Sequence, residues 1–221
     1  MKYILHIDTS TDIGMIVVSR DGKPLAQRVN EKTRDHAGTI NTMIDEALKD
    51  AGIALNDLHA ISVCGGPGSY TGLRIGMATA KGLCYTLNIP LINDNRLTLL
   101  AHQAWRAHHG YHSYVALLKA REKEYFITIH DANFNCILAP QHIPEEQLSL
   151  LPIAGETIFV ISAVLEEVTD FLPVGSVQND KNERIAPEAW CFSAFEKYNC
   201  NLTVNLYTAE PFYLKQVYTH K

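Results

Sequence analysis

The sequence lacks a long apolar run, paired cysteines and an excess of basic residues. No apolar stretch approaches the ~20 residues that a membrane-spanning helix needs. The first apolar stretch already closes at Asp8, which is too short for a signal peptide. We therefore expect a cytoplasmic protein that has no membrane partner. The five cysteines form no C-x-x-C pair and are odd in number, which argues against a disulfide framework and a thiolate zinc site.

The balance of charge argues against a protein that grips nucleic acid alone. The chain carries 19 Lys and Arg residues against 24 Asp and Glu residues, a net charge of −5, and its basic residues do not cluster. Neutralisation of phosphates supplies much of the affinity of nucleic-acid-binding proteins. If RNA is the substrate, we expect another subunit to hold it.

Apolar periodicity predicts an α/β fold with mixed sheets flanked by helices. Two lobes are expected, an N-terminal lobe over residues 1–110 and a smaller C-terminal lobe over residues 111–221. Prolines interrupt the pattern in the second half. The expected strands are 3–7, 13–18, 25–30, 60–64, 89–92, 114–118, 125–130 and 157–161. The expected helices are 40–51, 71–87, 96–109, 164–171 and 187–198.

The most informative segment, residues 65–83, is a glycine-rich loop that leads into the second expected helix. Such a loop can hold an anion, because free N–H groups and the helix dipole both point outward. A structural turn explains it equally well. Neither a P-loop nor a G-x-G-x-x-G motif fits, since Leu73 stands where lysine is needed and the glycines are spaced too widely. The candidate anion or nucleotide contacts are Gly66, Gly68, Ser69, Thr71 and Arg74.

The helix after this loop contains small residues at three- or four-residue spacing. Glycine inside a helix costs up to ~1 kcal/mol relative to alanine, so this pattern predicts the close approach of another backbone. That backbone belongs either to the chain's own sheet or to a partner. We take the surface of the first two helices as a candidate interface, although part of the first helix must also cover the sheet. The candidate contacts are Ile40, Met43, Ala47, Gly72, Arg74, Ile75, Gly76, Thr79 and Ala80.

On these residues the sequence resembles the TsaB (YeaZ) family. The resemblance is carried by residues 7–10, 66–76 and 80–83, with fainter matches at 120–125 and 211–215. In the second half, Lys119 stands where the family usually has aspartate. The match covers the first half well and the middle of the second half hardly at all.

The resemblance implies an actin-like ATPase and RNase H-like (ASKHA) fold in two lobes. It also implies a non-catalytic dimerisation subunit, without a cofactor of its own, whose first two helices form the dimer surface. Its partners would be the catalytic paralogue (TsaD) and a P-loop ATPase (TsaE). The assembly would make threonylcarbamoyladenosine beside the anticodon of tRNA, which is contacted only through the complex. A nucleotide at the shared interface and a homodimer of the chain alone are left open.

A metal-dependent hydrolase of the glycoprotease type is one alternative. The catalytic paralogue carries two histidines, four residues apart, after the strand that follows the glycine helix. Those positions are Arg96 and Leu100 here, and neither side chain replaces imidazole at a metal. His108 and His112 have the same spacing but lack an adjacent glutamate and lie where a helix is expected to end.

Two further enzyme classes share the expected fold. A nuclease of the RNase H type needs several carboxylates around two metal ions, and only Asp8 stands in a suitable place. A hydrogen bond from Asp8 to its own turn is therefore the preferred interpretation. A small actin-like phosphotransferase would need two phosphate loops and a larger second lobe than this chain offers.

Overall fold

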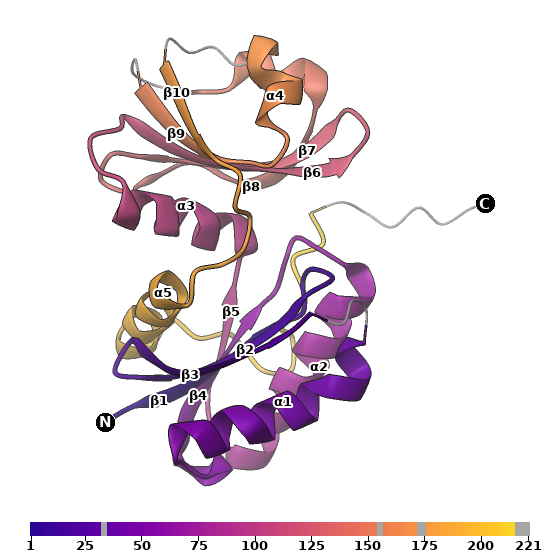
Figure 1. The fold of residues 1–221 in the computed structure, drawn as a ribbon, viewed down its shortest axis with the longest axis vertical. Helices are drawn as coiled ribbons and strands as arrows, with labels where there is room; N and C mark the ends of the chain where they lie inside the picture. Colours follow the sequence, from indigo (N-terminus) through magenta and orange to yellow (C-terminus); the bar gives the residue numbers. More distant parts are fainter. Residues whose placement is uncertain (32–34, 154–156, 172–175, 215–221) are drawn as a thin grey trace, which may run out of the picture. The chain divides into compact units, whose positions relative to one another are not determined.

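The computed structural model of the chain describes residues 1–31, 35–153, 157–171 and 176–214 (Figure 1). The strands are β1 Tyr3–Asp8, β2 Gly14–Arg20, β3 Lys23–Asn30, β4 Leu58–Cys64, β5 Leu91–Asp94, β6 Ser113–Arg121, β7 Glu124–Asp131, β8 Cys136–Pro144, β9 Thr157–Ile161 and β10 Ser176–Asp180. The helices are α1 His36–Ala51, α2 Tyr70–Leu87, α3 Arg96–Ala107, α4 Leu165–Val168 and α5 Pro187–Asn199. Within these described ranges, no helix is both long enough and apolar enough to cross a bilayer.

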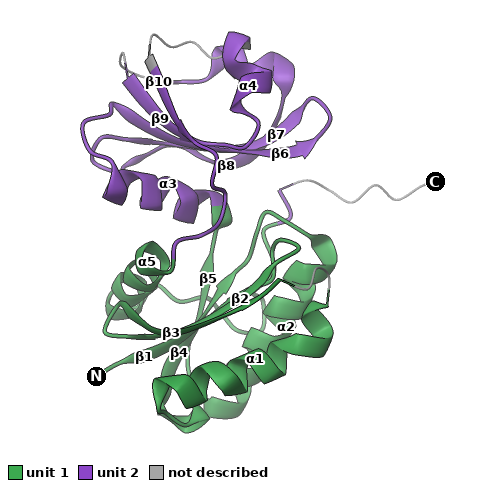
Figure 2. Cartoon of the chain, viewed as in Figure 1, with its two compact units in different colours: residues 1–96, 187–212 green, residues 97–186, 213–221 purple. Residues whose placement is uncertain are grey.

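The chain forms two compact units, and each contains a five-stranded sheet of the same topology (Figure 2). Unit 1 comprises residues 1–96 and 187–212, and unit 2 comprises residues 97–186 with the described residues from 213. The strand order is β3-β2-β1-β4-β5 in unit 1, and β8-β7-β6-β9-β10 repeats it in unit 2. In both sheets the first three strands are antiparallel neighbours, and the last two run parallel to the first.

The division into units differs from the lobes expected at 1–110 and 111–221. Most of α3 belongs to unit 2, and α5 returns to unit 1 after unit 2 is complete. Trp190 explains this return, because its side chain on α5 is fully buried and donates from Nε1 to Ser62 Oγ on β4. Contacts between residues so far apart in sequence leave no local pattern, so the sequence suggested a single boundary instead.

One face of the unit 1 sheet packs against α1 and α2 (Figure 1). The apolar spacing expected on the first helix is confirmed, and Gly52 ends α1 in the left-handed conformation as predicted. The core side chains alternate along each strand, which leaves the intervening ones for the opposite face. The buried residues of α1 are His36, Ile40, Met43, Ile44, Ala47 and Leu48.

The opposite face of the same sheet contains a buried polar cluster among apolar side chains, and it is covered by α5. Asp94 is fully buried at the end of β5, and its Oδ2 accepts hydrogen bonds from Ser62 Oγ (2.6 Å) and Trp190 Nε1 (2.9 Å). Lys197 Nζ on α5 donates to Asp94 Oδ1 at 2.5 Å. His6 on β1 lies edge-on to the Trp190 ring, and burial lowers its pKa to about 4, although Asp94 acts in the raising direction.

The sequence prediction missed two strands of unit 2. β8 contains Pro140 and Pro144, and it lies at the edge of its sheet, where a missing backbone N–H is tolerated. β10 is the opposite edge and has only Val177 as an apolar residue. Edge strands such as these show little alternation. By contrast, the buried strand expected at 157–161 is observed as β9 with the same bounds.

We predict that Asp94→Ala destabilises the chain by about 3 kcal/mol, because it leaves Trp190 Nε1 and Lys197 without their shared carboxylate. Urea unfolding followed by tryptophan fluorescence measures the change. Asp45→Ala is the matched control, since Asp45 forms only an exposed pair with Lys49. Equal unfolding midpoints for the two variants would contradict a structural role for the buried cluster.

Candidate functional site

The glycine loop between β4 and α2 packs directly onto the turn that follows β1. Ser69 N donates to the Ser10 carbonyl at 2.7 Å, and Thr9 Oγ1 donates to the Gly72 carbonyl at 2.7 Å. A Cβ added at Gly68 would collide with the Ser10 carbonyl, and one at Gly72 would collide with the Thr9 carbonyl. Glycine is therefore required at both positions, because backbone meets backbone there.

This contact continues one turn further along α2. A Cβ on Gly76 would collide with Thr9 Oγ1, and Ala80 is fully buried in the unit 1 core. The close approach that the small residues predicted is therefore present. It is made by the chain's own turn, which corrects the idea that a partner helix explains Gly72 and Gly76.

The candidate contacts on α1 also require correction. Ile40, Met43 and Ala47 are only 3%, 8% and 0% exposed, and all three belong to the unit 1 core. Their helical spacing marks the face of α1 that packs against the sheet. A partner could not reach them without opening this unit.

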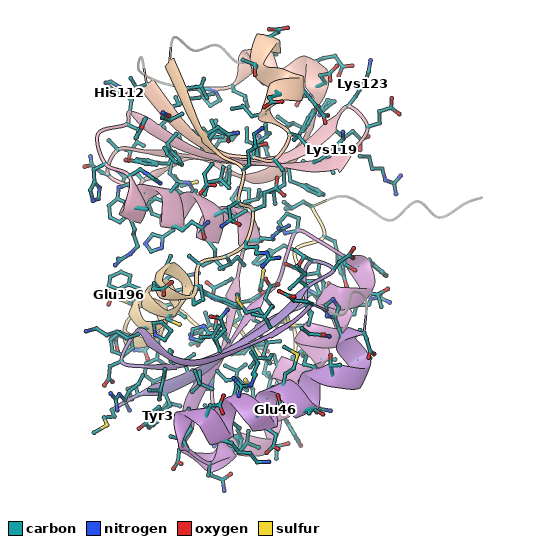
Figure 3. All side chains as sticks on the ribbon, viewed as in Figure 1. Tyr3, Glu46, His112, Lys119, Lys123 and Glu196 are labelled. Atoms are coloured by element: carbon teal, nitrogen blue, oxygen red, sulfur yellow. The ribbon has the colours of Figure 1, made fainter. Side chains whose placement is uncertain are left out.

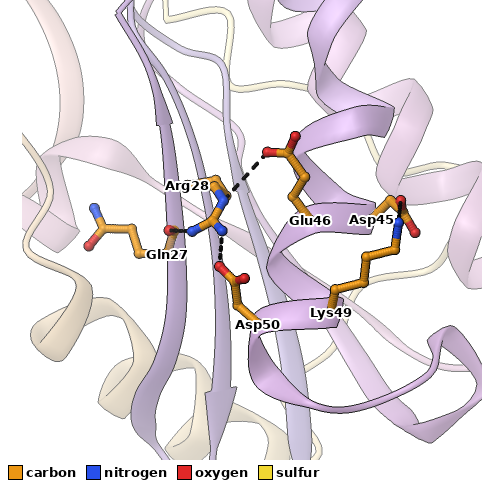
Figure 4. A network of polar contacts seen from close by, with 6 residues as sticks. All are labelled: Gln27, Arg28, Asp45, Glu46, Lys49 and Asp50. Atoms are coloured by element: carbon orange, nitrogen blue, oxygen red, sulfur yellow. Dashed lines mark hydrogen bonds and ion pairs between the residues drawn. The ribbon is translucent and has the colours of Figure 1, made fainter.

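The outer face of α1 is charged instead. Figure 3 shows Glu46 on this outer side, and Figure 4 shows its ion pair with Arg28 of β3, at 3.5 Å between Oε2 and Nε. Arg28 also pairs with Asp50, and Asp45 pairs with Lys49 one helical turn away. Exposed pairs of this kind contribute little to stability, so the face is best described as a solvated, charged surface.

Arg74 belongs to the exposed stripe of α2. Its guanidinium lies over the ring of Tyr70, with Cζ 4.2 Å from the ring centroid, and this cation–π contact offsets the unfavourable position near the helix N-terminus. Ile75 and Thr79 are half-buried. The exposed stripe includes Thr71, Arg74, Ala78, Gly82, Tyr85 and Thr86. Arg74 is thus one predicted interface residue that the structure presents to solvent.

Several groups that an anion would need in the glycine loop are engaged within the chain. Ser69 Oγ accepts from Gly72 N at 3.3 Å, as the N-cap of α2. Ser69 N is engaged as well, because it donates to the Ser10 carbonyl at 2.7 Å. Gly66 is buried with φ of 109°, and its carbonyl is held by Arg96 N at 2.7 Å. These bonds favour the structural-turn interpretation. An anion at the exposed Thr71 and Arg74 stays a prediction.

The preferred interpretation of Asp8 is confirmed. Its Oδ1 accepts a hydrogen bond from Ser10 N at 2.8 Å, within the turn that meets the glycine loop. Burial, with a smaller contribution from the charge of Asp8, raises the pKa of the Cys64 thiol well above its ordinary value. Cys64 is thus a packed thiol rather than a nucleophile.

Neither the paralogue's histidine positions, Arg96 and Leu100, nor the pair His108 and His112 forms a metal centre among the residues that the structure describes. Leu100 is fully buried in α3, which ends at Ala107, before the histidine pair. The His108 ring stacks on Phe159, with centroids 4.2 Å apart, and His112 Nδ1 lies 3.0 Å from Thr157 Oγ1. Among the residues that the structure describes, no group of three or more His, Cys, Asp and Glu side chains could hold a metal ion.

Sequence reasoning did not foresee the C-terminal strap, which we define as residues 200–214. Val204 forms an antiparallel bridge to Leu91 at the edge strand β5. Phe212 N then donates to the Gly65 carbonyl at 2.7 Å, beside the glycine loop. Lys81 on α2 donates to two carbonyls of the strap. Only the family-like ending at residues 211–215 signalled that this segment matters.

Comparison with known proteins gives matches over most of the chain. The family model of TsaD, tRNA N6-adenosine threonylcarbamoyltransferase, matches residues 25–148. The chain is 34% identical over 166 residues to the tRNA threonylcarbamoyladenosine biosynthesis protein TsaB of Escherichia coli, covering 71% of this chain and 70% of that protein. It is 34% identical over 126 residues to TsaB of Haemophilus influenzae, covering 57% of this chain and 52% of that protein. The second match thus spans about half of that relative's length.

Solved structures show the fold. YeaZ from Pseudomonas aeruginosa superposes with a TM-score of 0.79 at 24% identity, covering 97% of this chain and 100% of that one. The ethanolamine utilization protein EutJ from Carboxydothermus hydrogenoformans has a TM-score of 0.51 at 12% identity, covering 87% and 90%. Together with the repeated sheet order, these likenesses confirm the expected actin-like (ASKHA) fold.

We predict opposite effects for alanine at two glycines of α2. Gly76→Ala should cost about 1–3 kcal/mol, because the new methyl group collides with Thr9. Gly82→Ala should stabilise by up to ~1 kcal/mol, since an added Cβ there has no atom within 4 Å and alanine favours the helix. Urea unfolding measures both variants. If the Gly76→Ala variant is as stable as the Gly82→Ala variant, Thr9 in the turn after β1 does not pack closely against α2 at Gly76.

Proposed function

This chain belongs to the TsaB (YeaZ) family, and from that membership we propose that it is the non-catalytic subunit of an assembly that makes threonylcarbamoyladenosine in tRNA. The observation that carries the proposal is the similarity to TsaB of Escherichia coli over 71% of this chain. The proposal includes the cytosolic location expected from the sequence.

The two positions at which the catalytic paralogue carries histidine support a role other than catalysis for this chain. Arg96 and Leu100 offer no imidazole, and the Leu100 side chain is fully buried. Asp8 uses its carboxylate to hold the turn after β1. We therefore propose that the chemistry belongs to the catalytic paralogue (TsaD), and that a P-loop ATPase (TsaE) joins the same assembly.

The exposed N-terminal half of α2 is the surface that we propose for the catalytic paralogue. Thr71, Arg74 and Ala78 follow one another at helical spacing and are exposed, whereas the α1 residues first considered are buried. The TsaD model matches residues 25–148, which include α1 and α2, so the paralogue is expected to carry equivalent helices. Related subunits can pair through equivalent surfaces about an approximate twofold axis.

A phosphotransferase of the same fold is less well supported. Such an enzyme needs phosphate loops whose N–H groups are available to the ligand. Here Ser69 N is bonded to the Ser10 carbonyl, and Gly72 N is bonded to Ser69 Oγ. Because these N–H groups are already bonded within the chain, we infer that the glycine loop positions α2 rather than binding a nucleotide.

We predict that Ala78→Arg weakens pairing with the catalytic paralogue, because a long cation at the centre of the exposed α2 surface prevents close packing. Co-purification and isothermal titration calorimetry measure the pairing, which should weaken at least tenfold. Reconstituted tRNA modification should fall in parallel.

Ala107→Arg is the matched control, since Ala107 is an exposed alanine at the end of α3 in unit 2. It should pair and support modification like the unchanged chain. Full pairing and activity of Ala78→Arg would contradict the proposed surface. Unfolding curves of both variants establish that the chain is intact.

We also predict that the isolated chain binds tRNA weakly, because a net charge of −5 opposes an anionic ligand. At physiological salt, fluorescence anisotropy with labelled tRNA should give a Kd weaker than about 10 μM. The signal should strengthen when the catalytic paralogue is added. Submicromolar affinity of the chain alone would show that it carries an RNA site of its own.

A further inference from the structure

The C-terminal strap, the yellow segment that follows α5 in Figure 1, is tied to several parts of unit 1. Its Val204 N–H donates to the Leu91 carbonyl of β5 at 2.9 Å. Further along, the carbonyls of Tyr207 and Ala209 accept from the Lys81 ammonium group of α2, at 3.4 Å and 3.2 Å. The strap is thus bonded to an edge strand and to a helix before it reaches the glycine loop.

At the glycine loop, the strap lies against the two glycines with which the loop begins. Phe212 N donates to the Gly65 carbonyl at 2.7 Å. A Cβ added at Gly65 would collide with Asn93 Oδ1 and crowd the Phe212 ring, so the ring lies directly on the loop backbone. Asn93 Nδ2 in turn donates to the Glu210 carbonyl at 2.9 Å. Both Gly65 and Gly66 are buried.

Little apolar burial holds the strap in place. The structure describes all of residues 200–214, and only Ala209 among them is buried. Tyr207 is 79% exposed and Leu202 is 63% exposed, whereas Trp190 of the preceding helix α5 is fully buried. Segments with few buried apolar contacts and exposed hydrogen bonds open at a lower free energy than their domain unfolds. The strap has the properties of such a segment.

We propose that the strap is a latch, that is, a segment that docks on unit 1 or detaches from it as a whole while the sheet stays folded. Detachment uncovers the start of the glycine loop and leaves the Gly65 carbonyl without the Phe212 N–H. The loop keeps its bonds to Asp94 and Arg96, so it loosens rather than unfolds. Ser69, the N-cap of α2, belongs to the same loop. The first turn of α2 therefore loses order when the strap detaches.

Lys81 supplies the charged contact of the latch. The turn at residues 205–209 is closed by its own bonds, because Ala209 N donates to the Asn205 carbonyl and Tyr207 N donates to Asn205 Oδ1. This preformed turn presents the carbonyls of Tyr207 and Ala209 to one ammonium group. A hydrogen bond from a charged donor is stronger than one from a neutral donor. Removal of the charge should therefore shift the strap toward the detached state.

Residue-resolved amide hydrogen exchange of the isolated chain tests the latch. The amides of Val204 and Phe212 report docking of the strap, and the Ser69 amide, bonded to the Ser10 carbonyl, reports the loop. In the unchanged chain, Val204 and Phe212 should exchange at similar opening free energies and faster than the central strand β1. In Lys81→Met, which keeps a long side chain, exchange should rise about fivefold or more at both strap amides and about twofold or more at Ser69.

Two further variants complete this experiment. Lys81→Arg keeps the positive charge and should exchange like the unchanged chain. Lys49→Met is the matched control, since Lys49 forms an exposed ion pair with Asp45 on α1, and it should also leave exchange unchanged. Strap amides that exchange as slowly as β1 in every variant would overturn the latch. So would a Lys81→Met variant that accelerates the strap amides and leaves Ser69 unchanged, because the strap would then not order the loop.

The consequence for the catalytic paralogue rests on the proposed function and is measured separately. Because the docked strap orders the first turn of α2, the docked form is the one that pairs, and the apparent Kd rises as the docked fraction falls. Phe212→Pro removes the N–H that the Gly65 carbonyl accepts, so the strap should stay detached. Calorimetry should then give a Kd about fivefold or more above that of the unchanged chain.

The two measurements fail in different ways. An unchanged Kd for Phe212→Pro, with exchange at Ser69 accelerated, would overturn the control of pairing by the strap. If the unchanged chain does not pair with the paralogue at all, the proposed function fails, and the exchange measurements on the isolated chain still decide whether the strap is a latch.

Discussion

The contact between the turn after β1 and the first half of α2 fixes the architecture of unit 1. Thr9 and Ser10 present carbonyls where α2 and its loop have glycine, so no side chain separates the two segments. Backbone against backbone allows little rotation of the helix, because any shift brings hard contacts. The turn therefore determines which residues of α2 are covered and which, such as Arg74, reach solvent.

The sheet of unit 1 has two faces with different chemistry. The face under α1 and α2 is packed with apolar side chains, whereas the face under α5 adds the polar side chains of His6, Ser62 and Asp94 to its apolar ones. Buried polar groups need matched partners, so they accept fewer alternative helices than an apolar face does. This difference explains how α5, which is remote in sequence, docks on one face with a defined register.

The sequence predicted the elements better than the environment of their residues. The helix beginning near Thr71 and the strand at 157–161 followed from local periodicity and were confirmed. The assignment of Ile40, Met43 and Ala47 to an interface was wrong, because apolar spacing shows that a helix face is buried but not which neighbour covers it. The same ambiguity applied to Gly76. β8 escaped prediction because its prolines are tolerated only at the edge of a sheet, and edge position is a tertiary property.

The discontinuity of unit 1 has a consequence for its synthesis on the ribosome. The sheet strands of unit 1 are complete at residue 94, but α5 begins only at residue 187. At elongation rates of about 5–20 residues per second, roughly 5–20 s pass before α5 is made. Until then, the groups that α5 covers in the complete chain, among them His6 and Asp94, have no helix over them. The strands of unit 2 end at residue 180, so both sheets are synthesised before the helix that completes unit 1.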